Sequence, residues 1–104
     1  MRDVKITVLK VTLDKELCAK YGHPDITPCH KHYEGQVMIA KGGQRPPEMC
    51  GGAWTPAEKY IFALSQGVDH FGFKNWMGVD KTVVTCCVDG LRPITLLLEA
   101  VDEA

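Results

Sequence analysis

The chain contains five cysteines, Cys18, Cys29, Cys50, Cys86 and Cys87, and their thiols are the side chains best suited to chemistry. A deprotonated thiol is both a nucleophile and a ligand for soft metal ions. The odd count favours reduced thiols over a closed disulfide framework. The alternative is that several of these thiols are small buried hydrophobic side chains without a chemical role.

Metal coordination is the first hypothesis for these thiols. The proposed ligands are Cys29, Cys50, Cys86 and His30, because thiolate and imidazole are the usual ligands of zinc and iron sites. No Cys-x-x-Cys pair is present, so a site would have to be assembled from three separate segments. His32 lies on the same side as His30 if this stretch is extended, although surface histidines are the ordinary interpretation.

A reactive thiol is the second hypothesis, with Cys50 or Cys87 as the catalytic nucleophile or redox group. Gly51 and Gly52 follow Cys50 and allow a ligand to approach the backbone closely. A positive partner such as Arg92 would activate the thiol. The alternative for Cys50 is a loop cysteine packed under Trp54.

Ligand binding is the third hypothesis, with Arg92, Asp89 and Trp54 as the contacts. The planar guanidinium of Arg92 suits a carboxylate or a phosphate, and Asp89 could orient it. A turn aspartate beside a solvated arginine is the simpler explanation.

The segment 82–88 is expected to be a strand, and side chains alternate between the two faces of a strand. The thiols of Cys86 and Cys87 should therefore point to opposite faces, so that one packs in the core and the other faces a site. Asp89-Gly90 predicts a two-residue hairpin turn to a further strand at 94–101.

Hydrophobic periodicity predicts the remaining elements. Strands are expected at 4–8, with a bulge near Leu9, and at 36–40, and a short helix capped by Asp14 at 15–20. A capping box at 55–58 predicts the main helix at about 56–66. The aromatic segment 68–78 is expected to cover the core as a loop, with an oligomer interface as the alternative role for its aromatic side chains.

Together these elements predict an α+β domain over residues 1–104, with a mostly antiparallel sheet of about four strands and one main helix packed on it. A small, partly closed barrel is the alternative. The chain has 12 basic and 13 acidic residues and no long basic run, which argues against nucleic-acid binding. No apolar stretch approaches membrane-spanning length, and the strand-like opening lacks a signal-peptide core, so a cytoplasmic location is expected.

Several motifs occur in one order along nearly the whole chain: Pro28-Cys29, Gly35-Gln36, Cys50 to Trp54, and the Cys86 to Pro93 segment. This order resembles a family of short, functionally uncharacterised prokaryotic proteins found largely in anaerobes. The closing Cys-Cys-Val-Asp-Gly-Leu-Arg-Pro element is the most specific part of the resemblance. His30 stands where the family pattern often has a second proline. The resemblance implies a stand-alone domain and no particular activity.

The sequence thus favours a small domain that binds a metal ion or a small anion where the Cys29, Cys50 and Cys86/Cys87 segments meet. Zinc and iron are the candidate metals, and the cofactor remains open. A small thiol enzyme and a non-catalytic accessory or homo-oligomerising subunit are the alternatives.

Overall fold

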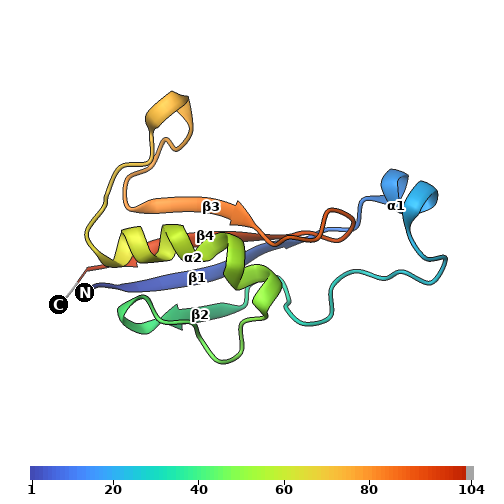
Figure 1. Cartoon of the computed structure of the whole chain (residues 1–104), viewed down its shortest axis with the longest axis horizontal. Coiled ribbons are helices and arrows are strands. Elements are labelled where there is room, and N and C mark those ends of the chain that lie inside the picture. Colours follow the sequence, from blue (N-terminus) through green and yellow to red (C-terminus); the bar gives the residue numbers. More distant parts are fainter. Residues whose placement is uncertain (103–104) are drawn as a thin grey trace.

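Strands β1 (Asp3–Val11) and β4 (Ile94–Val101) lie side by side at the centre of a sheet in the computed structural model, which describes residues 1–102. The edge strands are β2 (Val37–Ala40) beside β1 and β3 (Thr82–Cys86) beside β4, so the order is β2-β1-β4-β3 (Figure 1). Every neighbouring pair is antiparallel. The predicted α+β class with an antiparallel sheet is confirmed. The barrel alternative is wrong, because the sheet is open and ends at β2 and β3.

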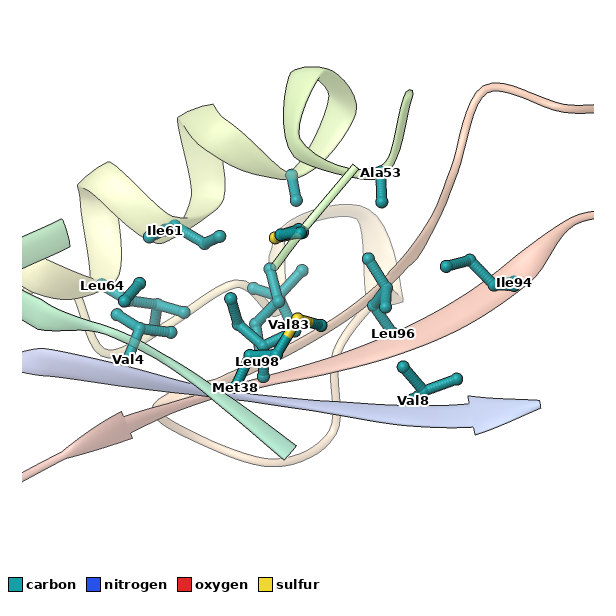
Figure 2. Packing of buried hydrophobic residues seen from close by; sticks show 14 of the residues in the cluster. Val4, Val8, Met38, Ala53, Ile61, Leu64, Val83, Ile94, Leu96 and Leu98 are labelled. Carbon is teal, nitrogen blue, oxygen red and sulfur yellow. The ribbon is translucent and has the colours of Figure 1, made fainter. Parts of the chain in front are cut away.

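Helix α2 (Gly51–Ser65) lies across one face of this sheet, and the core fills the space between them (Figures 1 and 2). Alternate residues of each strand point toward the helix, as the period of two requires. The buried side chains of the helix are small near its N-terminal end and larger further along. The fully buried residues include Val4, Ile6, Val8, Met38, Val83, Leu96 and Leu98 from strands and Ala53, Ala57, Ile61 and Leu64 from α2.

The start of α2 differs from the sequence prediction by five residues. The helix begins at Gly51 with Cys50 as its N-cap, so Pro56 lies inside it. Thr55 is not a cap, because its hydroxyl donates to the Gly51 carbonyl at 2.9 Å within the helix. The predicted end is close to correct, and Gly67 adopts the expected left-handed conformation with φ of 101°.

Two local predictions near the N-terminus are confirmed. The β1–β4 register shifts between Val8 and Lys10, which is the irregularity expected near Leu9. Helix α1 (Lys15–Tyr21) is capped by Asp14, whose carboxylate accepts the N–H of Leu17 at 3.0 Å. This helix lies beyond one end of the sheet (Figure 1). In residues 1–102 no helix has the length and apolar character needed to cross a membrane.

The aromatic segment before β3 covers the core only in part. Phe71 is buried and meets Tyr60 edge to face, with ring centroids 6.2 Å apart. Phe73 and Trp76 are exposed, although Trp76 also contacts the Tyr60 ring. The segment projects from the sheet around the 3₁₀ turn η2 (Phe73–Asn75), so the prediction of a closed lid is wrong for its tip (Figure 1).

Candidate functional site: a thiol-lined pocket with a fixed arginine

The connection between β3 and β4 is a seven-residue loop, 87–93, folded around the side chain of Asp89. The Asp89 Oδ1 atom accepts the backbone N–H groups of Leu91 at 2.9 Å and Arg92 at 3.1 Å. Gly90 is not among the residues with positive φ. The predicted two-residue hairpin turn is therefore wrong, because an aspartate that binds its own following backbone stabilises a wider turn.

The same carboxylate holds the side chain of Arg92. Asp89 Oδ2 accepts the Nε–H of Arg92 at 2.9 Å, and both side chains are partly exposed. This side-chain hydrogen bond is the largest cause that lowers the pKa of Asp89 below its ordinary value, and the two backbone N–H donors also lower it. The turn is thus folded around an ionised aspartate, and the arginine has a fixed direction.

The two adjacent cysteines differ in burial, as strand alternation predicts. The predicted division of roles is wrong, because Cys87 both packs against the core and lines the pocket described below, whereas Cys86 does neither. Cys86, the last residue of β3, is exposed, whereas Cys87 is half-buried and packs against the core. The backbone N–H of Cys87 donates to the Ile94 carbonyl at 3.1 Å, and its sulfur accepts the Ile94 N–H at 3.3 Å. The Cys87 thiol is therefore held in one position by the strand that follows it.

Cys50 is positioned by a buried histidine. Its backbone N–H donates to Nε2 of His32 at 3.2 Å, and Nδ1 of His32 lies 2.9 Å from Oε1 of Gln36. Because a backbone N–H is always the donor, Nε2 accepts and Nδ1 carries the proton toward Gln36. His32 is only 2% exposed, so it is a structural support for the N-terminus of α2 and not the surface residue expected.

The loop 87–93 also contacts the first turn of α2. The N–H of Val88 donates to the Gly52 carbonyl at 3.1 Å. A Cβ at position 52 would lie 3.2 Å from a methyl group of Val88, so glycine allows the loop to approach the helix closely. This contact brings Cys50 and Cys87 to one region of the fold.

A pocket of about 390 Å³ lies where these segments meet, and three cysteines line it: Cys29, Cys50 and Cys87. Val88 and Ile94 contribute apolar surface. The three segments that the sequence analysis expected to converge do so here. The pocket is within the size range of small-molecule sites, at its lower end.

Charged and polar groups also line the pocket. They are Lys31, Asp89 and Arg92, together with His30. Nε2 of His30 lies 2.8 Å from the Thr27 hydroxyl, so one ring nitrogen already has a partner. Among the described residues, the only contact within hydrogen-bond or ion-pair distance that the Arg92 guanidinium makes is through Nε. Its two terminal nitrogens therefore have no protein partner within residues 1–102.

Two predicted site residues lie outside the pocket. Trp54 donates its indole N–H to Glu58 at 2.8 Å on the surface of α2 and does not line the cavity. Cys86 does not line it either. Over residues 1–102 no group of three His, Cys, Asp or Glu side chains is arranged to hold a metal ion, so Cys29, Cys50, Cys86 and His30 do not form one ligand set here.

Sequence reasoning missed two members of the site. Lys31 was passed over because a single lysine in a polar stretch carries no signal, yet it lines the pocket. His32 was noted only as a possible partner of His30, because no local pattern reveals that a lone histidine is buried.

Comparison with protein-family models, with curated proteins and with solved structures gave no match. The resemblance to the anaerobe family therefore stays a prediction, and the function must be argued from the pocket.

Proposed function

We propose that this chain binds a small carboxylate-bearing molecule in the pocket between the α2 N-terminus and the loop 87–93. The observation that carries the proposal is the state of Arg92, whose Nε is bound by Asp89 at 2.9 Å while its terminal nitrogens lack a partner among the described residues. An arginine fixed in this way loses little conformational entropy on binding and can hold a carboxylate with two parallel hydrogen bonds.

The charge balance favours a ligand with one negative charge. Lys31 and Arg92 are positive and Asp89 is negative among the lining residues, which leaves a net charge near +1 with His30 neutral. Cys50 is the N-cap of α2 and Gly52 lies in its first turn, where the helix dipole adds partial positive charge. A doubly charged phosphate would be less well matched to this balance than a carboxylate.

The rest of the lining favours an apolar body on the ligand. The three thiols, Val88 and Ile94 are poorly hydrated groups that pack against carbon or sulfur. The proposed ligand is therefore a short carboxylic acid whose carboxylate meets Arg92 and whose apolar part contacts the thiols.

A ligand screen followed by amide chemical shifts tests this proposal. Short aliphatic carboxylates, the matching amides and inorganic phosphate would each be titrated into the labelled protein. We expect saturable shifts at Gly52, Val88 and Arg92 with carboxylates and much weaker shifts with amides of the same shape. Equal shifts with acids and amides would contradict a role for Arg92 as the anion contact.

A thiol reaction with such a ligand is the second candidate function. Cys50 is the N-cap of a 15-residue helix, and the Cys87 sulfur already accepts an N–H, so both sulfurs lie near groups that stabilise negative charge. Rates of alkylation at neutral pH would be measured for the wild type and for Cys50→Ser and Cys87→Ser. The enzyme alternative requires one pocket thiol to react much faster than the exposed Cys86, and uniformly slow labelling would exclude it.

A further inference from the structure

The face of the sheet opposite α2 has no covering element among the described residues. The strand register identifies the side chains on this face. It places Val37, Thr7, Leu97 and Val84 in one row across all four strands. Val37 and Val84 are exposed, and Leu97 is half-buried between them. The adjacent row contains Ile39, which is 41% exposed. The face therefore carries an apolar band that Thr7 interrupts, and Lys5 and Glu99 lie in the row beside it.

The dimensions of the molecule agree with an open face of this kind. The extents are 48 × 33 × 20 Å, and the shortest fits one sheet and one helix layer. The radius of gyration is 14.6 Å, whereas a compact domain of this length has about 13 Å. The accessible surface is 6547 Å², compared with about 5,800 Å² for a monomer of this mass. The segments that project from the sheet, around α1 and η2, contribute to this excess (Figure 1).

The size of the face suits a second protein layer. Four strands at ~4.8 Å spacing are roughly 19 Å wide, and β1 at ~3.4 Å per residue is about 30 Å long. The flat area of such a face is at most about 570 Å², because β2 and β3 are shorter than β1. This is close to the lower limit of the about 600–1,000 Å² that stable interfaces bury on each partner. Two sheets that pack face to face keep their strands within about 30° of each other.

The charges on the face are complementary to those of a second copy. Lys5 and Glu99 are cross-strand neighbours on the two central strands. Within the described residues neither makes an ion pair within 4 Å, although their strands are adjacent. A two-fold axis that runs between β1 and β4, parallel to the strands, places β1 over β4 of the other copy. Lys5 then lies over Glu99 of the partner subunit, and Thr7 lies over Leu97 of the partner subunit.

We propose that two copies of this chain pair through the open sheet face, with Leu97 at the centre and Lys5 against Glu99 of the partner subunit on both sides of the axis. This arrangement covers the apolar band and gives each of the two central charges a second oppositely charged neighbour, besides the one across the strands of its own chain. It leaves the thiol-lined pocket free, because the pocket lies at the α2 N-terminus and the loop 87–93. The dimer is independent of the proposed ligand, so the two proposals fail separately.

Sedimentation velocity over a range of concentrations tests the dimer. At high concentration the wild type is expected to have an apparent mass twice that of the monomer. Leu97→Lys places a charge at the centre of the face and should weaken the dimer at least tenfold. Phe62→Lys is the matched control, because Phe62 is 54% exposed on α2, and it should leave the dimer unchanged. A wild type that stays monomeric throughout would overturn the proposal, as would a dimer that Leu97→Lys leaves intact.

A charge exchange between chains tests the arrangement without touching the centre of the face. Lys5→Glu alone and Glu99→Lys alone each place like charges together in a homodimer, so each should dimerise at least severalfold more weakly than the wild type. A mixture of the two variants restores both opposite pairs and should form a heterodimer more tightly than either homodimer. Pairing within one chain cannot produce this rescue, so absence of the heterodimer would contradict the proposed axis.

Discussion

The backbone N–H of Val88 donates to the carbonyl of Gly52 at 3.1 Å, and this carbonyl is the one that Pro56 leaves without its helical partner. Residue 56 is four positions after residue 52, and proline has no N–H to give. A proline inside a helix is normally destabilising because it orphans a carbonyl. Here the orphaned carbonyl anchors the loop 87–93 on α2, and so places Cys87 and Arg92 beside Cys50.

Pro56→Ala should loosen this anchor. The new N–H would compete with Val88 for the Gly52 carbonyl. Loss of one hydrogen bond costs about 1 kcal/mol, which raises the equilibrium constant for opening of the loop by roughly a factor of five. We expect hydrogen exchange at Val88 to accelerate by about that factor relative to Cys87, whose N–H is bound within the hairpin. If the ratio of the two exchange rates is unchanged, the proline has no part in positioning the loop.

His32→Leu should destabilise the fold through the N-cap of α2. The substitution leaves the Cys50 N–H without its partner and removes the stronger of the two contacts of the Gln36 side-chain oxygen, at a cost of about 1–3 kcal/mol. The neighbouring His30→Leu is the control, because His30 is exposed and should change stability by less than about 0.5 kcal/mol. Urea denaturation measures both, and equal effects would show that His32 has no special structural role.

The lowered pKa of Asp89 should make the stability of the fold depend on pH in the acid range. Its pKa in the folded state lies below the ordinary value of 3.8, so its stabilising contribution is complete above that value and is lost as the pH falls through the lower folded pKa. Asp89→Asn should retain the backbone bonds of the turn but lose the Arg92 pair, and should cost less than about 1 kcal/mol at pH 7. Asp89→Ala loses both and should cost about 1–2 kcal/mol.

Urea midpoints for these two variants would be compared with the wild type at pH 7 and at pH 3. The difference between wild type and Asp89→Asn should shrink at the lower pH, because the Asp89 carboxyl group of the unfolded chain, with its ordinary pKa of 3.8, is then largely protonated. A difference that grows as the pH falls would have the wrong sign for a lowered pKa.

The rates at which the thiols are alkylated should follow their solvent exposure in the fold. Cys86 is exposed and should react first with a small alkylating reagent, whereas Cys18 is 9% exposed and should react last. Modification of Cys86 should leave the amide shifts of Asp89 and Arg92 unchanged, because its side chain does not line the pocket. Modification of Cys87 should move them. Mass spectrometry and amide spectra of the modified protein read out both effects.

Features that depend on short-range patterns could be predicted from the sequence. Asp14 could be predicted as an N-cap because a short acidic side chain before a helix can accept a backbone N–H of the first turn. The opposite directions of Cys86 and Cys87 followed from strand geometry alone. The convergence of the Cys29, Cys50 and Cys87 segments was expected from their shared chemistry, although no sequence pattern indicates the geometry in which they meet.

Features that depend on tertiary contacts could not be predicted. Thr55-Pro56-Ala57-Glu58 matches a helix start locally, but the helix extends back to Gly51. Its start is stabilised by His32, which accepts the Cys50 N–H, and by Val88, whose N–H donates to the Gly52 carbonyl. Both partners are distant in sequence. Asp89-Gly90 likewise matches a tight hairpin, and the wider turn forms because the Asp89 carboxylate binds both the following backbone and Arg92.

Calorimetric titration of the best carboxylate from the screen into the wild type, Arg92→Gln and Lys74→Gln tests the central claim most directly. Lys74→Gln removes one positive charge on the exposed η2 turn, away from the pocket, and therefore controls for net charge. We predict that Arg92→Gln weakens binding at least tenfold and that Lys74→Gln changes it less than twofold. Equal affinity of wild type and Arg92→Gln would contradict the proposed function.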